Sequence, residues 1–408
     1  MPVYSCVCPV AGSGRLEIQE QTWRVFLTGA TGFLGGELAV ALSKISSVEK
    51  IVCLVRAKSD EEAAERLGSV FALHHDAYDR NKVLAVAGDL VDERLPSVLA
   101  RHPSLADINA VVHAGANTSF LQQKYPVIEQ TNLWGSQRIA EWASRLRSLE
   151  TFAYIGTATI VGAGDDVVGR MLNEDEAPNV LAKHLVGYTR SKMFGEMAVR
   201  SIIPDDKLLV IRPSILAGDA RSVVPRSFDI AWIITAMKDL RMFFGNPDAA
   251  CDVIPVDYAA NAIVELVMGP RTHTTYHVSA CASATTCRKV LDSVGCEDAG
   301  RPPLAYLGRK QLELVKKWLR TNDAPDPALS PYSGHIDFIS DEIGKKKARL
   351  LLSGLETYWQ FIDLDQRFDN SRLLADTSIG ISEPAHHYLK RTAVYFNDID
   401  PLEAAVNP

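Results

Sequence analysis

Tyr188 and Lys192 stand four residues apart, a spacing that places a phenol and an ammonium on one face of a helix. A phenol can donate a proton to an oxygen that gains negative charge, and a neighbouring cation lowers the phenol pKa from its ordinary value of about 10. Thr157 follows an apolar stretch at 151–155 and offers a hydroxyl to the same oxygen, with Thr159 as the alternative. Because the Tyr188 and Lys192 spacing is common on solvated helices, its meaning depends on its surroundings.

A glycine-rich turn far upstream supplies those surroundings. Gly29 allows a tight bend after the apolar strand expected at 25–27. Gly32 lets the backbone approach phosphate groups, and Gly35 lets the helix expected at 33–42 pack closely on a sheet. A nicotinamide dinucleotide held by this turn would deliver hydride to a carbonyl, whose oxygen the phenol could protonate, so the two motifs together predict a reductase. The expected contacts of the turn are Thr28, Gly29, Thr31, Gly32, Phe33, Leu34 and Gly35.

Short apolar segments alternate with amphipathic ones through the first half of the chain. Strands that alternate with helices form a parallel sheet covered on both faces. The sequence therefore predicts an α/β fold with a doubly wound parallel sheet of the Rossmann type. Beyond 25–27, strands are expected at 50–55, 83–87, 110–113, 151–155 and 207–211, and helices at stretches such as 60–71 and 135–147.

The end of the second expected strand bears on the choice of dinucleotide. An acidic residue there usually binds the ribose hydroxyls of NAD, whereas this chain has Arg56, followed by Lys58. A cation suits a ribose phosphate, which predicts NADPH; the alternative is a solvated basic residue at a strand end. Asp89 is expected at the adenine edge, and small residues at the end of the fourth strand would let the cofactor lie flat, namely Ala114, Gly115 and Ala116.

Several motifs together carry a resemblance to a known family. The chain resembles the extended short-chain dehydrogenase/reductases and, within them, the thioester reductases: fatty acyl reductases of the "male sterility" type and the reductase domains of carboxylic acid reductases and nonribosomal peptide synthetases. The resemblance spans residues 23 to about 268. It rests on Thr28 to Gly35, Leu54 to Ala57, Gly88-Asp89-Leu90, Val112 to Asn117, Thr131 to Gly135, Tyr188 to Lys192, Ile211 to Ser214 and Ile254 to Asp257.

The resemblance implies roles for individual positions. Thr157, Tyr188 and Lys192 resemble the catalytic trio, with Lys192 also holding the nicotinamide ribose. Asn132 resembles the Asn that shapes the helix behind the active site. Gly156 and Ala114 depart from the residues that are common in this family at these positions, so the shape of the substrate pocket stays open. Further dinucleotide contacts implied by the resemblance are Gly29, Gly32, Gly35, Arg56, Asp89 and Leu90, and the segment beside the nicotinamide amide is Pro213-Ser214-Ile215.

Beyond residue 269 the character of the chain changes. Prolines and turns crowd 300–303 and 323–331, while helices are expected at 308–319, 341–352 and 384–394. The expected organisation is an N-terminal arm at 1–21, an NADPH-binding domain at 22–280 with a substrate-lining insertion at about 216–250, and a mainly helical C-terminal domain at 281–408. The stretch from Phe361 to Ser371 resembles the C-terminal segment of fatty acyl reductases, which implies a domain that covers the nicotinamide and lines an acyl tunnel.

The insertion is a second candidate wall for that tunnel. Large apolar residues recur through 221–246 at helical spacing. The same pattern is also typical of an ordinary hydrophobic core, so both interpretations stay open. The residues concerned are Phe228, Trp232, Met237, Met242, Phe243 and Phe244.

Composition narrows the class of protein. The 408 residues are 47% hydrophobic and 23% charged, which suits a dinucleotide-binding domain with an added lid. A net charge of -7 argues against nucleic acid, and no apolar run reaches the roughly 18 residues of a membrane span. The seven scattered cysteines, with only Cys6 and Cys8 close together, predict free thiols, no metal site and a cytoplasmic location.

The predicted activity is NADPH-dependent reduction of acyl thioesters to an aldehyde, with a further step to the alcohol left open. The implied partner is acyl-CoA or an acyl or peptidyl carrier protein. Basic residues at 345–347, Lys310, Lys316 and Lys317 could dock such a carrier or form a solvated helix face. Both a monomer and a homodimer are compatible with the sequence.

Two other classes of function use the same motifs. Nucleotide-sugar epimerases and reductases of free carbonyl or hydroxyl substrates share the trio of Thr157, Tyr188 and Lys192. A non-enzymatic dinucleotide sensor is a third interpretation, although such proteins often lose the Tyr or the Lys. Net consumption of NADPH separates a reductase from an epimerase.

Overall fold

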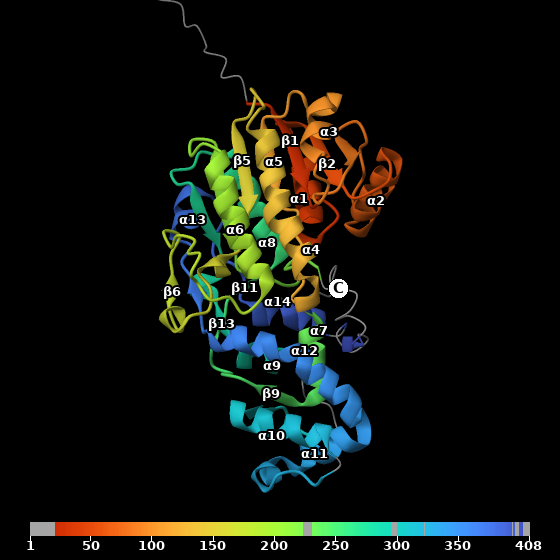
Figure 1. Ribbon diagram of the computed structural model, residues 1–408, viewed down its shortest axis with the longest axis vertical. Coiled ribbons are helices and arrows are strands. Elements are labelled where there is room, and N and C mark those ends of the chain that lie inside the picture. The colour runs from red at the N-terminus through yellow and green to blue at the C-terminus, as the bar shows by residue number, and fades with distance from the viewer. Residues whose placement is uncertain are drawn as a thin grey trace, which may run out of the picture.

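The computed structural model describes residues 21–222, 231–294, 300–321, 323–393, 395 and 400–402. The expected N-terminal arm with Cys6 and Cys8, and Phe228 of the expected tunnel wall, lie outside these residues. Two bodies stack along the long axis of the molecule, a sheet with helices on both faces and a smaller helical body below it (Figure 1). No helix among the described residues is long and apolar enough to cross a membrane.

The main sheet has seven parallel strands in the order β12-β7-β5-β4-β1-β2-β3. This confirms the predicted doubly wound fold. The seventh strand, β12 at Thr275–Val278, was not predicted, and the sixth, β7, runs two residues beyond the expected 211. The strands are β1 Trp23–Thr28, β2 Val48–Val55, β3 Val83–Ala87, β4 Ala110–His113, β5 Thr151–Ile155, β7 Leu208–Pro213 and β12 Thr275–Val278.

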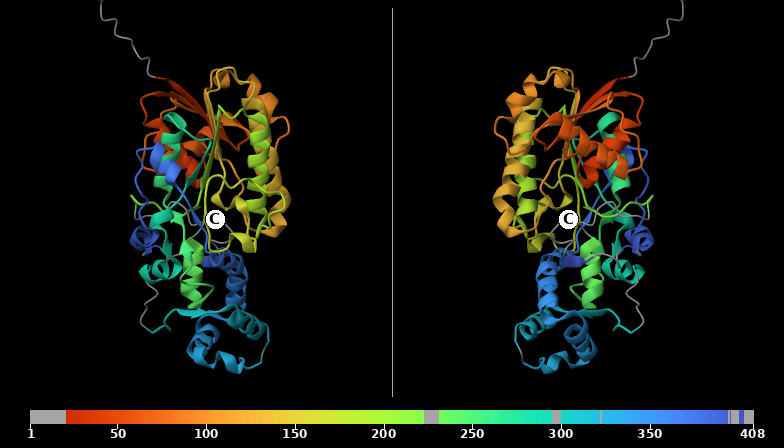
Figure 2. Two further views of the ribbon diagram at one scale, coloured as in Figure 1. Left: turned by 90° about the vertical axis from the view of Figure 1, so that its left-hand side faces the viewer. Right: turned by 90° about the vertical axis from the view of Figure 1, so that its right-hand side faces the viewer.

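Side chains that alternate along each strand build two separate cores. Val25 and Leu27 of β1 face one core, whereas Phe26 faces the other. Because a strand buried on both faces needs apolar residues at every position, these strands read as continuous apolar runs. Figure 2 shows the two helical layers on either side of the sheet. One layer is α1 Phe33–Ser43, α2 Asp60–Leu73 and α8 Val256–Met268; the other is α3 Leu95–Arg101, α5 Gly135–Ala143 and α6 Gly187–Ile202, with α4 at Tyr125–Glu129 beside it.

The second body has its own hydrophobic core. Trp232, Met237, Met242, Phe243 and Phe244 are all buried in it, so the pattern in the insertion is that of a core. The helix expected at 341–352 starts instead at Lys345, after Gly344 with φ 82°, and runs to Asp363. The helices are α7 Ala231–Leu240, α9 Cys287–Ser293, α10 Arg309–Arg320, α11 Ser333–Phe338, α12 Lys345–Asp363 and α14 Ala385–Thr392.

Four short strand pairs, three parallel and one antiparallel, and a segment that returns from the second body to the sheet complete the described fold. After α12 the chain runs back to the sheet, where α13 at Ser371–Asp376 places Leu373 in the core shared by α1 and α8. The Tyr276 hydroxyl donates to the Asp376 carboxylate over 2.5 Å and fastens α13 beside β12. The short strands are β6 Met171–Leu172, β8 Ile215–Leu216, β9 Met242–Phe244, β10 Ala250–Cys251, β11 Val253–Ile254, β13 Thr285–Thr286, β14 Ala305–Leu307 and β15 Arg367–Phe368.

Candidate active site

The glycine turn between β1 and α1 has the shape of an anion cradle. Gly29 has φ 78°, and a Cβ there would stand 2.8 Å from the backbone of Gly115. A Cβ on Gly35 would overlap the Gly29 carbonyl oxygen, whereas one on Gly32 would meet only that oxygen, at 3.4 Å. Space is therefore tight where α1 packs on the turn and open where phosphates would approach.

Helix α1 begins without any group of its own that satisfies its first N–H donors. Its N-cap is Gly32, which has no side chain to accept them, and no acidic residue lies in the first turn. Free donors and the positive end of a helix dipole attract phosphate. The residues present thus fit the pyrophosphate of a dinucleotide.

The predicted contacts of the adenosine half lie at the carboxyl ends of β2 and β3. Arg56 is exposed directly after β2. The guanidinium of Arg66 donates to the Arg56 carbonyl, which adds to Arg56 and Lys58 a further cation that the sequence did not reveal. Asp89 accepts a hydrogen bond from the Val91 N–H at 3.2 Å. Leu90 packs against Gly115, where a Cβ would come within 2.9 Å of it.

The three residues predicted for catalysis meet at the carboxyl end of β5. Thr157 caps the turn after β5, with its hydroxyl 3.0 Å from that of Thr159. Tyr188 lies in the first turn of α6, and the Thr157 hydroxyl is a hydrogen-bond partner of its phenol. Lys192, one turn further, is buried and donates to the Ile155 carbonyl over 2.5 Å.

The electrostatics of this site differ from the expectation. Burial raises the pKa of Tyr188 to about 12, against the smaller lowering effect of the Thr157 hydroxyl. Burial also lowers the pKa of Lys192 to about 7, although Glu196 opposes this. The expected lowering of the Tyr188 pKa by Lys192 is wrong for the protein without a dinucleotide, because desolvation outweighs any attraction from the ammonium.

Asn132 lies behind the site. It belongs to a π-helix at Gln130–Trp134, and its amide donates to the Asn117 carbonyl and to the Ser191 hydroxyl, both at 2.9 Å. The side-chain oxygen of Asn132 accepts the Asn117 N–H at 2.7 Å. Both N–H donors are used within the protein, so the structure places Asn132 as a support of α6.

The segment predicted beside the nicotinamide amide, Pro213-Ser214-Ile215, is held by hydrogen bonds to neighbouring segments. Ser214 joins β7 to β8, and its N–H donates to the Val278 carbonyl at 2.9 Å. The buried Asp252 accepts N–H groups of Ala280 at 2.7 Å and Phe368 at 3.2 Å, while burial raises the pKa of its carboxyl group. The Ile215 N–H donates to the main-chain carbonyl of Asp252 at 3.4 Å, so Asp252 links Pro213-Ser214-Ile215 to the C-terminal segment, a role that no local pattern indicates.

An aromatic cluster joins the Tyr188 phenol to the second body. The Phe120 ring lies 6.0 Å from that of Tyr188 and 5.1 Å from that of Tyr358 on α12, and is nearly parallel to both. Phe361 of α12 and Trp232 of α7 extend the cluster. Phe120, Tyr358 and Phe361 are only partly buried, so the cluster offers apolar surface beside the phenol.

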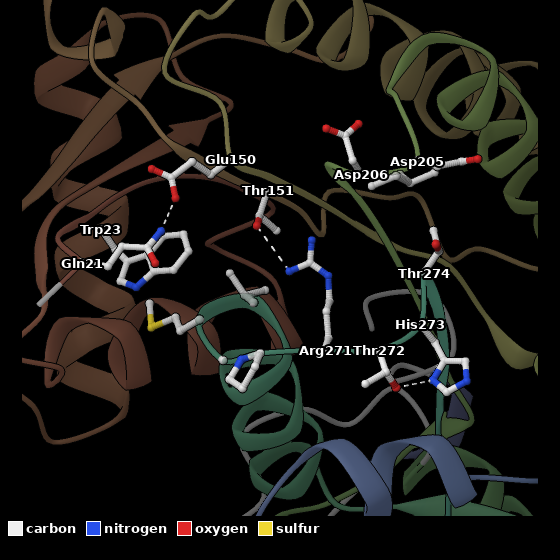
Figure 3. Close-up of a pocket in the computed structure, with 15 residues that line it drawn as sticks. Gln21, Trp23, Glu150, Thr151, Asp205, Asp206, Arg271, Thr272, His273 and Thr274 are labelled. Carbon is white, nitrogen blue, oxygen red and sulfur yellow. Dashed lines mark hydrogen bonds between the residues drawn. The ribbon is translucent and has the colours of Figure 1, made fainter. Parts of the chain in front are cut away.

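A pocket of about 680 Å³ lies at the opposite end of the sheet, where β1, β5 and β12 begin (Figure 3). Its walls include Trp23, Thr151 and Arg271, whose guanidinium donates to the Thr151 hydroxyl at 3.4 Å. None of the predicted site residues lines it. Among the described residues no three His, Cys, Asp or Glu side chains gather as a metal site would require.

A parallel sheet, a glycine cradle at its carboxyl edge and a Thr-Tyr-Lys trio beside it define an extended short-chain dehydrogenase/reductase. The chain belongs to the family described as "Male sterility protein", whose model matches residues 27–263. The non-canonical nonribosomal peptide synthetase cpsA of Aspergillus campestris is 29% identical over 253 residues, which are 60% of this chain and 24% of that protein. The aldehyde reductase lnbA of Aspergillus flavus is 28% identical over 255 residues, with 60% and 25% covered. The chain therefore spans about a quarter of the length of each of these relatives.

Solved structures share the fold over nearly the whole chain. The terminal R domain of the myxalamid PKS-NRPS pathway superposes with a TM-score of 0.70 at 21% identity, covering 94% of this chain and 93% of that one. A thiolation-reductase di-domain from an archaeal nonribosomal peptide synthetase gives 0.65 at 19% identity, with 93% and 76% covered. At this level of identity the likeness concerns the fold alone.

Replacement of Tyr188 by Phe removes the proton donor and keeps the ring that packs on Phe120. We expect the kcat of dinucleotide-dependent carbonyl reduction to fall by about 10²–10⁴ while the Kd of the dinucleotide stays within twofold. The measurements are steady-state rates and fluorescence titration. Tyr78→Phe is the matched control because that ring stacks on Phe71, away from the site. Wild-type turnover in Tyr188→Phe would contradict the assigned role.

The pKa of Lys192 leads to a second expectation. As the pH rises through about 7, the buried ammonium loses its proton in the protein without dinucleotide, and a neutral amine binds the dinucleotide less well. We therefore expect kcat/KM for the dinucleotide, which reports groups of the free protein, to decline above that pH. Lys192→Arg stays charged throughout and should flatten the decline, whatever its absolute rate. An unchanged decline in Lys192→Arg would assign the titration to another group.

Proposed function

We propose that this protein is an NADPH-dependent reductase of acyl thioesters. The observation that carries the proposal is the contact of the Tyr188 side chain with both the Thr157 hydroxyl and the Phe120 ring, with the glycine cradle at the same sheet edge. Family membership supports reduction, and the apolar surface supports an acyl group as the part of the substrate beside the phenol.

The chain's own residues account for the proton chemistry. A nicotinamide bound at Pro213-Ser214-Ile215 would supply hydride to the thioester carbonyl carbon. Thr157 and Tyr188 then donate hydrogen bonds to the carbonyl oxygen, and Tyr188 transfers its proton to it. Because burial keeps the pKa of Tyr188 at about 12, the phenol holds that proton at neutral pH and acts as an acid. The resulting hemithioacetal loses its thiol and leaves an aldehyde, which a second hydride could take to the alcohol.

We propose that the thiol is carried by coenzyme A or by a carrier protein. A structural neighbour is a thiolation-reductase di-domain, which supports the carrier. The basic cluster at 345–347 is largely engaged within the protein: Lys345 donates to the Thr321 carbonyl at 3.0 Å, and Lys347 pairs with Asp239 at 3.3 Å. Docking would therefore fall on the exposed Lys310, Lys317 and Lys346.

The decisive experiment is NADPH consumption by the purified protein with octanoyl-CoA, palmitoyl-CoA and an octanoyl-loaded carrier protein, with products identified by mass spectrometry. We expect aldehyde or alcohol to appear with matching NADPH oxidation, and neither with Tyr188→Phe. Bound NADPH that no thioester consumes, together with interconversion of a nucleotide sugar, would replace the proposal with an epimerase.

We also propose that Arg56 selects NADPH through the ribose phosphate. Arg56→Ala should raise the Kd of NADPH about tenfold, since a hydrogen bond to a charged group contributes roughly 1.5–3 kcal/mol, and should leave that of NADH unchanged. Both constants come from fluorescence titration. Lys44→Ala, an exposed cation paired with Asp76, is the control for general charge loss. Equal losses for NADH and NADPH would leave Arg56 without a role in selection.

A further inference from the structure

A buried histidine that no step of the chemistry uses sits between the two motifs of the site. His113 ends β4 and is fully buried. Its Nδ1 lies 2.8 Å from the Thr28 hydroxyl, and its Nε2 lies 2.9 Å from the Ser136 hydroxyl. Thr28 precedes the glycine turn, and Ser136 lies one turn after Asn132, so the imidazole bridges the two.

One arrangement of protons satisfies all the hydrogen bonds around His113. In it the Ser136 hydroxyl donates to the main-chain carbonyl of Asn132 at 2.6 Å and accepts from Nε2–H of His113. Nδ1 of His113 is then an acceptor, and the Thr28 hydroxyl donates to it. That hydroxyl in turn accepts the Gly115 N–H at 2.9 Å, so each hydroxyl gives and takes one hydrogen bond.

The ring is also held neutral. Burial lowers the pKa of His113 to about 3, and the nearby charge of Lys192 adds to this effect. The Tyr154 ring lies 6.0 Å from the imidazole, while the Lys192 ammonium lies 4.6 Å from the Tyr154 ring. A neutral imidazole with one fixed tautomer therefore sits behind the cation of the trio.

The path passes through Asn132 itself, from the main-chain carbonyl that Ser136 contacts to the side-chain amide, and continues from there to α6. The Asn132 amide donates to the Ser191 hydroxyl, which donates to the Tyr188 carbonyl at 2.7 Å. Gly195 lets α6 approach closely, because a Cβ there would overlap the Asn132 carbonyl oxygen. A continuous buried path thus runs from the glycine turn to the backbone of the residue that donates the proton.

We propose that His113, fixed as the Nε2–H tautomer, is a positioning residue that couples the seating of the dinucleotide at the glycine turn to the placement of Tyr188. The role of Tyr188 rests on the proposed function, but the coupling itself concerns this chain and the dinucleotide. Hydrogen bonds in one buried network are energetically coupled, typically by 0.5–3 kcal/mol. Loss of the imidazole should therefore affect both the glycine turn and the backbone at Tyr188.

The tautomer can be observed directly in the full-length wild-type protein. With ¹⁵N-labelled histidine, we expect NMR to show His113 with a protonated Nε2 and a bare Nδ1, and this pattern should persist from neutral pH down to about pH 5, since the group stays neutral there. The resonance is assigned by its loss in His113→Gln. A protonated Nδ1, or an imidazolium at neutral pH, would overturn the proposal without any need for a substrate.

The coupling is tested by NADPH binding in a double-mutant cycle. Ser136→Ala interrupts the path at a point that does not touch the glycine turn, and we expect it to weaken NADPH binding about threefold or more. His113→Phe should weaken binding too. The double variant should bind NADPH no more weakly than the weaker-binding single variant. His113→Gln, whose amide offers one acceptor and one donor, should restore most of the affinity. His335→Gln in the second body is the control.

Additive losses, or an unchanged Kd in Ser136→Ala, would refute the coupling, and failure of His113→Gln to improve on His113→Phe would reduce His113 to a packing residue. If His113→Phe does not fold, Ser136→Ala and Ser191→Ala provide the same cycle from groups on the far side of the imidazole. Failure of the proposed thioester reduction leaves each of these readouts intact, so the two proposals can fail separately.

Discussion

The active site depends on one close contact, the packing of the first turn of α1 against the bend at Gly29. A side chain on Gly35 would overlap the Gly29 carbonyl oxygen, so the helix can sit this close only because Cβ is absent. The contact aims the uncapped N–H groups of α1 across the carboxyl edge of the sheet. It also presses the bend against Gly115, and the Thr157, Tyr188 and Lys192 groups meet at the same edge.

Much of this architecture could be predicted because its signals are local. Residues 83–87, 110–113 and 151–155 are mostly apolar runs with the boundaries that the strands have, each with at most one polar residue at an end, since strands buried on both faces are rich in apolar side chains. The glycine spacing is a local signal too, because the backbone of the turn leaves no room for a side chain at Gly29 and Gly35. β12 escaped prediction because its four residues include two polar ones, Thr275 and His277, that are buried by distant partners.

The remaining features arise only when distant segments meet. Asp252 is separated from Phe368 by more than a hundred residues, and Phe120 touches α12 from a loop after β4. No pattern within a window of sequence reports such contacts. The sign of the Tyr188 pKa shift was missed for the same reason: the Tyr-Lys spacing indicates a nearby cation, whereas desolvation depends on how the whole fold closes around the hydroxyl.

The raised pKa of Tyr188 also bears on the direction of the chemistry. A phenol that stays protonated at neutral pH suits an oxygen that must acquire a proton, as in carbonyl reduction, and suits alcohol oxidation poorly, because there the group must first be a base. The Phe120 ring, from the loop after β4, stacks both on Tyr188 and on Tyr358 of α12. The second body therefore contributes to the apolar surface beside the phenol, so this one interdomain contact bears on the shape of the space next to the proton donor.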